Sequence, residues 1–185
     1  MGRFSPEKNC HLLIEAFEKT NTPLKLALAG GSSHTDDYVA SIRKCENQRI
    51  KFLDWLSGDA LEEVLTNAAL FVLPSGLEGL SLALLEAMGA GVCVLTSDTP
   101  ENCEVIEGTG FTFKRGDVLE RMLDLLLSDP RLRAASGISG QQRARHHYLW
   151  ETIVKEIDAV YAGLIGPSTT RKTTSRPVEA SGRVA

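Results

Sequence analysis

The sequence has few cysteines, and their arrangement suggests neither a metal site nor a disulfide framework. Cys10, Cys45, Cys93 and Cys103 are scattered, with no CxxC pair and no Cys/His spacing typical of zinc ligands. Cys93 lies in an apolar run and is expected to be a buried, reduced thiol. No apolar stretch suited to a secretory signal follows Met1. Reduced thiols and the missing signal favour a cytoplasmic protein.

Long hydrophobic runs and a large excess of one charge are missing too. The longest apolar run, residues 80–95, is shorter than the roughly 20 residues of a membrane-spanning helix, and it contains Glu86. A net charge of −4 gives no general reason to expect nucleic acid or an anionic membrane as a partner. We therefore predict no membrane span and no nucleic-acid partner.

The residues that are present suit one folded domain. The chain of 185 residues is 43% hydrophobic and 24% charged, which is ordinary for a domain with a sizeable core. That length is too short for two full-sized domains. Residues 166–185 are polar and poor in apolar residues, and they contain two prolines. We predict a domain over residues 1–165 and a disordered polar tail over residues 166–185.

Apolar segments alternate with amphipathic ones along the chain. We predict strands at residues 24–29, 50–53, 70–73 and 92–96, weaker elements at 104–106 and 110–113, and helices at 10–19, 36–45, 60–67, within 77–89, at 119–127 and at 150–165. Because the strands are apolar throughout and alternate with helices, they are typical of a parallel sheet covered on both faces. The predicted fold class is α/β with a Rossmann-like, doubly wound parallel sheet. For the arginine-rich segment 131–147, a solvated helix face is favoured over a basic binding patch.

The most informative segment is residues 78–91, which follows the predicted strand at 70–73 and a Pro-Ser-Gly turn. Ligands of open α/β sheets bind at this carboxyl end of the strands. A helix that begins near Ser81 has unpaired N–H groups in its first turn, and such an end attracts phosphate. Gly79 would allow a diphosphate to approach the backbone closely.

Two carboxylates flank the predicted helix start. The neighbours of Glu86 make every face of its helix apolar, so we expect a buried helix in which Glu86 needs a partner. Ligand hydroxyl groups could be that partner, and so could a backbone amide or an arginine of this chain. Glu78 alone is more typical of an exposed loop carboxylate. The two acids together, eight positions apart around a helix start, indicate a binding site more specifically than either acid alone.

The segment resembles the Glu-x7-Glu signature of retaining glycosyltransferases with the two-domain GT-B fold, the glycosyl transferases group 1, which include bacterial mannosyl- and glucosyltransferases. Six other stretches agree with that family in order, and they are Gly2-Arg3-(x4)-Lys8-Asn9, Ala29-Gly30-Gly31, Phe52-Leu53-Asp54, Val72-Leu73-Pro74-Ser75, Glu104-Val105-Ile106 and Tyr148-Leu149-Trp150. Each stretch alone is weak evidence for the family, whereas the six stretches in the correct order are strong evidence for it. The resemblance covers residues 1–164 and implies the C-terminal, donor-binding half of a GT-B enzyme.

The resemblance implies a role for each matching residue. Arg3 and Lys8 would contact the donor diphosphate and stabilise charge on the leaving group, while Glu78 would hold hydroxyl groups of the sugar. The implied catalytic residues are thus Arg3, Lys8 and Glu78, and the implied donor-binding residues are Gly79, Leu80, Ser81 and Leu82 through their backbone amides, Glu86 at the ribose, and Gly30, Gly31, Asp54, Trp55 and Leu56 near the base.

The implied reaction moves a hexosyl group from a UDP-, GDP- or ADP-sugar to an acceptor hydroxyl, with retention of the anomeric configuration. No metal or other cofactor is expected, in line with the lack of an Asp-x-Asp pair. Three positions depart from the family pattern: Ser81 and Asp54 stand where glycine is common, and Ala83 where proline is common. These departures affect donor identity and base contacts more than the fold.

The resemblance also implies missing parts. In the family a central apolar strand runs directly into the stretch that Gly2-Arg3 matches, and here only Met1 precedes the glycine. We therefore expect a truncated first strand, and a chain that is inactive or nearly so without an N-terminal acceptor-binding domain. The complete enzyme would lie in the cytoplasm, either free or at the inner face of the membrane.

Two other interpretations remain open. One is a non-catalytic α/β interaction module or a subunit of a split enzyme, suggested by Trp150 and the stripe Ile153, Ile157 and Val160, although core packing also explains that stripe. The other is a different GT-B enzyme, such as a sugar-nucleotide epimerase or a phosphorylase, which the Glu-x7-Glu pattern makes less favoured.

Overall fold

Strands and helices alternate along the chain, as the hydrophobic pattern predicts. The computed structural model describes residues 1–114 and 116–165, so the predicted tail at 166–185 lies outside the described residues. The elements in order are β1 (Gly2–Arg3), η1 (Pro6–Lys8), α1 (Cys10–Glu18), β2 (Leu26–Gly31), α2 (Asp36–Arg43), β3 (Ile50–Leu53), α3 (Gly58–Thr66), β4 (Phe71–Leu73), α4 (Leu82–Gly89), β5 (Val94–Ser97), α5 (Pro100–Ile106), β6 (Phe111–Phe113), α6 (Gly116–Ser128), α7 (Pro130–His147) and α8 (Trp150–Ile165). Two compact units divide between Leu149 and Trp150.

The strands of the first unit form two three-stranded sheets. One has the order β1-β2-β3 and the other β4-β5-β6, and all four pairings are parallel. In the first sheet Leu26 lies opposite Ile50, and in the second Phe71 lies opposite Val94. The predicted α/β class with parallel sheets covered by helices is confirmed, although the backbone ladder is interrupted between β2 and β4.

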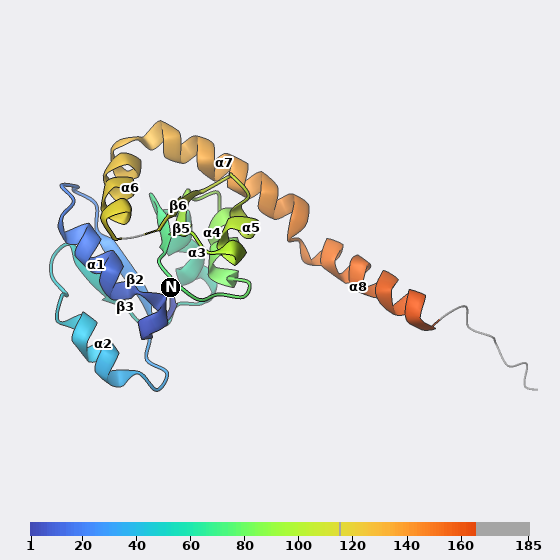
Figure 1. Cartoon of the computed structure of the whole chain (residues 1–185), viewed down its shortest axis with the longest axis horizontal. Coiled ribbons are helices and arrows are strands. Elements are labelled where there is room, and N and C mark those ends of the chain that lie inside the picture. Colours follow the sequence, from blue (N-terminus) through green and yellow to red (C-terminus); the bar gives the residue numbers. More distant parts are fainter. Residues whose placement is uncertain (115, 166–185) are drawn as a thin grey trace, which may run out of the picture. The chain divides into compact units, whose positions relative to one another are not determined.

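Helices cover both faces of these sheets, which is why the strands are apolar on both sides. Successive residues of the segment that forms β5 belong to two separate hydrophobic clusters: Cys93 and Leu95 pack with α1 and α6, whereas Val92 and Val94 pack with α4 and α5. Cys93 is buried, as predicted, and its burial raises the pKa of its thiol above the ordinary value. Figure 1 shows α6 and α7 following β6 along the chain.

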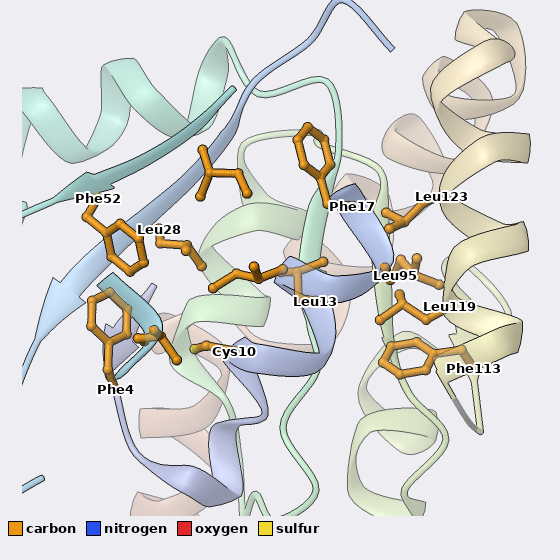
Figure 2. Close-up of a cluster of buried hydrophobic side chains, with 14 of the residues drawn as sticks. Phe4, Cys10, Leu13, Phe17, Leu28, Phe52, Leu95, Phe113, Leu119 and Leu123 are labelled. Atoms are coloured by element: carbon orange, nitrogen blue, oxygen red, sulfur yellow. The ribbon is translucent and has the colours of Figure 1, made fainter. Parts of the chain in front are cut away.

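Helix α1 lies at the centre of the larger cluster. Figure 2 shows Leu13 of α1 between two groups of side chains: Leu28 and Phe52 from β2 and β3 lie on one side, and Leu119 and Leu123 from α6 lie on the other. Leu13, Leu119 and Leu123 are each no more than 4% exposed. The two sheets are therefore joined by side-chain packing through α1 and α6.

Helices α5 and α7 are better defined than the sequence suggested. Thr99 caps α5 by accepting a hydrogen bond from the backbone N–H of Asn102 at 3.3 Å, and Pro100 occupies the first turn of that helix. In α7, Arg143 donates to the backbone oxygens of Glu104 and Val105 at 2.8 and 2.7 Å. This cation therefore lies at the C-terminal end of α5, where the helix dipole favours positive charge, and is not simply solvated.

The described part of the second unit is helix α8. Its apolar residues Val154, Ile157 and Val160 are all at least 47% exposed. None of the helices in the described residues is long and apolar enough to cross a membrane.

Two buried glycines of α7 provide a test of how this helix packs. A Cβ on Gly137 would lie 2.1 Å from the backbone oxygen of Gly91, whereas a Cβ on Gly140 would meet Met88 at 3.7 Å. We expect Gly137→Ala to lower the free energy of unfolding by roughly 1–3 kcal/mol, because a backbone atom must move. Gly140→Ala is the matched control, with a gain of up to about 1 kcal/mol from helix propensity. Urea denaturation measures both, and equal effects would contradict this packing.

Candidate functional site

An ion pair joins the two motifs that the sequence singled out. Lys8 ends η1, just after β1, and Glu78 lies in the loop between β4 and α4. The Lys8 Nζ donates to Glu78 Oε1 at 2.8 Å, and the two side chains are 25% and 12% exposed. Because both segments follow the carboxyl ends of parallel strands, their side chains meet at the same edge, where α/β folds bind ligands. Glu78 is thus a half-buried, paired carboxylate.

Two further contacts hold these two segments together. The backbone N–H of Gly76 donates to the backbone oxygen of Glu7 at 2.9 Å, and Asn9 Nδ2 donates to the backbone oxygen of Pro74 at 3.1 Å. Asn9 has a positive φ of 51°, a conformation that asparagine tolerates better than most residues. These contacts therefore keep the two segments that carry Lys8 and Glu78 close together, and no sequence pattern pointed to this role of Asn9.

The N-terminus of α4 lies just after Glu78. Ser81 is its cap: its buried Oγ accepts a hydrogen bond from the backbone N–H of Leu84 at 3.4 Å. Within the described part of the chain, no acceptor pairs with the backbone N–H groups of Leu82 or Ala83. These two donors are available for an anion such as phosphate.

The predicted burial of Glu86 is wrong, because its side chain is exposed. Helix α4 buries Leu84, Ala87 and Met88 completely, but Leu82 on its outer side is 64% exposed. The prediction of burial came from the apolar residues around Glu86, but one side of an apolar helix can still face solvent. Both carboxylate oxygens of Glu86 can therefore reach a ligand, and its contact with ribose stays a prediction.

The residues expected near the base lie at the ends of β2 and β3. Gly30 and Gly31 pair with Gly2 and Arg3 of β1. A Cβ on Gly30 would lie 1.8 Å from the Gly2 oxygen, and one on Gly31 would lie 2.7 Å from Nε1 of Trp55. Glycine at both positions thus lets β1 and the Trp55 indole approach the end of β2 closely.

The neighbours of Trp55 differ in their surroundings. Asp54 forms a weak, exposed ion pair with Arg43 at 3.5 Å, and Leu56 is half-buried. The Trp55 side chain is 59% exposed. An exposed indole beside two glycines offers a flat apolar surface of the kind on which a nucleotide base can stack.

One cavity brings several of these residues together. Its volume is about 1000 Å³, and its lining includes Arg3, Lys8, Glu78, Leu80, Ser81 and Leu82. The remaining candidate residues, which are Gly30, Gly31, Asp54, Trp55, Leu56, Gly79 and Glu86, lie outside its lining. The cavity thus joins the implied catalytic residues to the start of α4.

A smaller cavity of about 380 Å³ lies beside the ends of β4, β5 and β6 and was not anticipated from the sequence. Asp98 lines it and accepts hydrogen bonds from Cys103 Sγ at 3.1 Å and from Lys114, whose Nζ lies 3.0 Å away. These contacts hold the pKa of Asp98 below its ordinary value, and the Asp98 hydrogen bond raises the pKa of the Cys103 thiol. A thiol shifted in that direction is a poor nucleophile.

No cluster of three or more His, Cys, Asp or Glu side chains suited to a metal occurs in residues 1–114 and 116–165. The expectation of a reaction without metal stays a prediction.

Comparison with known proteins places this site in a family. Residues 1–143 match the family described as "Glycosyl transferases group 1". The chain belongs to this family. The matched residues include the Lys8–Glu78 pair and the start of α4, so both features lie within the glycosyltransferase domain.

Similar proteins agree with this assignment. The chain is 29% identical to "Uncharacterized glycosyltransferase MJ1607" of Methanocaldococcus jannaschii, over 87% of this chain and 43% of that protein. It is also 29% identical to a "GDP-mannose-dependent monoacylated alpha-(1-6)-phosphatidylinositol monomannoside mannosyltransferase" of Corynebacterium glutamicum, over 81% of this chain and 42% of that protein. The chain thus spans less than half the length of these curated relatives.

The fold agrees with a solved structure of Anabaena HepE in complex with UDP-glucose. The TM-score is 0.81 at 22% identity, over 88% of this chain and 48% of that one. At this identity the likeness shows the fold, which is that of half a GT-B glycosyltransferase.

The coupling within the Lys8–Glu78 pair is measurable with a double-mutant cycle of Lys8→Met and Glu78→Gln. We expect a coupling energy of about 1–2 kcal/mol, because the hydrogen bond joins two charged and largely shielded groups. The exposed pair Lys19–Glu120, at 3.0 Å, is the matched control and should couple by only a few tenths of a kcal/mol. Chemical denaturation of the six variants and wild type gives both energies, and equal coupling would contradict the description of a shielded pair.

The approach of Trp55 to Gly31 is testable by fluorescence. In a Trp150→Phe background, which leaves Trp55 as the remaining tryptophan, Gly31→Ala should shift the emission maximum because the new Cβ must displace the indole. Gly79→Ala is the control, since its Cβ would meet no atom within 4 Å. An unchanged spectrum in Gly31→Ala would mean that the indole does not lie against Gly31.

Proposed function

We propose that this chain is the donor-binding half of a retaining glycosyltransferase that transfers a hexosyl group from a nucleotide sugar to an acceptor hydroxyl. The observation that carries this proposal is the Lys8–Glu78 ion pair, which lies in one cavity with Arg3 and the start of α4. Family membership and the UDP-glucose complex of HepE support a nucleotide sugar as the ligand. GDP- and ADP-sugars remain candidates, since a relative named above is GDP-mannose-dependent.

The cations act on the diphosphate. Lys8 has three N–H donors and uses one on Glu78, so the others can reach phosphate oxygens. The exposed guanidinium of Arg3 can bind a phosphate through two parallel hydrogen bonds. As the bond to the sugar breaks, negative charge builds up on the leaving diphosphate, and these cations together with the Leu82 and Ala83 N–H groups stabilise that charge.

The two acids hold hydroxyl groups. Glu78 accepts the Lys8 hydrogen bond at Oε1, which leaves Oε2 for hydroxyl groups of the sugar. Lys8 also holds this carboxylate in a fixed orientation, so that its second oxygen can accept hydrogen bonds from the sugar. Glu86, exposed on α4, accepts from the ribose hydroxyls, and Trp55 stacks on the base.

In this proposal the acceptor and its binding groups belong to a separate N-terminal domain, so these residues bind the donor but transfer little by themselves. The departing phosphate takes the proton of the acceptor hydroxyl, and the new bond forms on the face from which the phosphate leaves. That route keeps the anomeric configuration and needs no metal.

Calorimetry with UDP, GDP and ADP tests the proposal. We expect one of them to bind, with Arg3→Ala and Lys8→Ala each weakening binding by about tenfold or more, since each loses a charge-assisted hydrogen bond. The matched controls are Arg145→Ala and Lys19→Ala, which remove exposed cations of α7 and of the residue after α1. Failure of a folded sample to bind any of the three would refute the proposal, as would Arg3 and Lys8 variants that bind like wild type.

A further inference from the structure

The smaller cavity, of about 380 Å³, borders the proposed donor site without belonging to it. Its described lining includes none of the residues to which the proposed function assigns a contact with the donor. Pro74 lines both cavities, and two other residues of the smaller one are neighbours of the ion pair in the chain: Asn9 follows Lys8, and Gly76 precedes Glu78 by two positions. The two cavities therefore share a wall at the start of the β4–α4 loop.

The lining of the smaller cavity has the composition of a small-molecule site, which combines apolar walls with a few polar groups. Leu12 and Phe113 provide apolar surface, and Asn9, Asp98 and Lys114 provide the polar groups. Small-molecule pockets have volumes of roughly 300–1000 Å³, so this cavity is near the lower end of that range. It suits a ligand of about the size of one sugar ring.

Asp98 has capacity for further hydrogen bonds. Its Oδ1 accepts from Cys103 Sγ at 3.1 Å, and its Oδ2 lies 3.0 Å from Lys114 Nζ. No other side chain of the described residues donates to this carboxylate, which can accept about four hydrogen bonds. These two contacts hold the pKa of Asp98 below its ordinary value, so the carboxylate is charged at neutral pH. Asp98 can therefore accept hydrogen bonds from about two ligand hydroxyl groups.

Asn9 and Lys114 add one further acceptor and some donors. Asn9 Nδ2 donates to the backbone oxygen of Pro74 at 3.1 Å, which fixes the plane of the amide, and Asn9 Oδ1 has no partner among the described residues. Lys114 has three N–H donors and uses one on Asp98, while its side chain is 78% exposed. The ligand thus meets both acceptors and donors.

The wall that carries Asp98 is held rigidly. The backbone N–H of Asp98 donates to the backbone oxygen of Phe113 in β6 at 2.9 Å. The preceding Ser97 Oγ donates to the backbone oxygen of Ser75 and accepts from Asn102 Nδ2 at 3.1 Å. Ser75 and Asn102 are at most 1% exposed. Because this wall is already ordered, a ligand loses little affinity to its reorganisation.

The charges in the cavity select against ionic ligands. Asp98 and Lys114 are paired, so their charges cancel. An anion such as phosphate would be repelled by the Asp98 carboxylate, and a cation would be repelled by the Lys114 ammonium. A hydroxyl group, in contrast, donates to a carboxylate and accepts from an ammonium.

We propose that the smaller cavity binds an uncharged ring with several hydroxyl groups, a single sugar or cyclitol ring that is not part of the donor. Asp98 and Asn9 accept hydrogen bonds from its hydroxyl groups, Lys114 donates to them, and the C–H faces of the ring pack on Leu12 and Phe113. This site goes beyond the proposed function, because it needs neither a nucleotide nor sugar transfer.

A titration followed by NMR tests the site, with myo-inositol and methyl α-D-glucopyranoside as the probes added to the 15N-labelled chain. We expect at least one of them to shift the backbone amides of Asp98, Thr99 and Phe113 in a saturable way. The expected Kd is on the order of 1–10 mM, since a ligand this small makes few contacts. Cyclohexanol, a ring with one hydroxyl group, should bind at least tenfold more weakly, and inorganic phosphate should give no saturable shift at these amides.

Two variants act on the site in different ways. Asp98→Asn keeps the shape but removes the charge, so we expect about tenfold weaker binding of the polyol. Leu12→Phe changes no polar group but fills part of the cavity, so binding should be lost. The matched controls are Asp124→Asn and Leu125→Phe, which alter an exposed carboxylate and an exposed leucine of α6 and should bind like wild type.

Three results would overturn the proposal. The first is that neither polyol causes saturable shifts at the cavity. The second is that folded Asp98→Asn and Leu12→Phe chains bind the polyol like wild type, and if one of the two does not fold, the other decides. The third is that phosphate binds there in place of the polyols, which would make the cavity an anion site.

Repeating the titration with UDP, GDP or ADP separates this site from the proposed function. If a polyol binds but no nucleotide does, the smaller cavity stands as a site and the proposed function fails. If a nucleotide binds but neither polyol does, the function stands and this site fails. If a nucleotide sugar displaces the polyol where the nucleotide alone does not, the cavity belongs to the donor sugar and the proposal of a separate ligand is wrong.

Discussion

The packing of α1 between the two sheets is the constraint on which the rest of the structure depends. Among the described residues no backbone ladder links β2 to β4, so the packing of side chains between the two sheets is a main connection between them. Leu13, Ile14 and Phe17 of α1 are each at most 4% exposed, and they contact residues of the first sheet and of α6 in one cluster. Burial of three such side chains contributes several kcal/mol, and that is what holds the sheets together.

The same packing places the candidate site. Because η1 leads directly into α1, fixing α1 also fixes Lys8, and the backbone contacts of Glu7 and Asn9 then tie this segment to the β4–α4 loop. Glu78 is held against Lys8 as a result. The position of the Lys8–Glu78 pair in the larger cavity is therefore a consequence of core packing.

Local signals made much of the fold predictable. Short apolar runs located β2, β3, β4 and β5, and amphipathic spacing located α1, α2, α3, α6 and α8 within a few residues. Helix α5 was underestimated because its seven residues are too few for a clear period, although Thr99 and Pro100 are ordinary helix-start residues. No local pattern predicted the split between the sheets, since it depends on which strand edges find partners and not on any residue type.

The sequence by itself determined the α/β class, the family motifs and the residue types of the candidate site, because each depends on the local pattern or on the order of short motifs. The tertiary structure alone decided which of those residues meet. It paired Lys8 with Glu78, which lie 70 positions apart, and it left Glu86 exposed on a helix whose composition predicted burial. The physical reason is that burial and ion pairing depend on what packs against a side chain, and such neighbours come from distant parts of the chain.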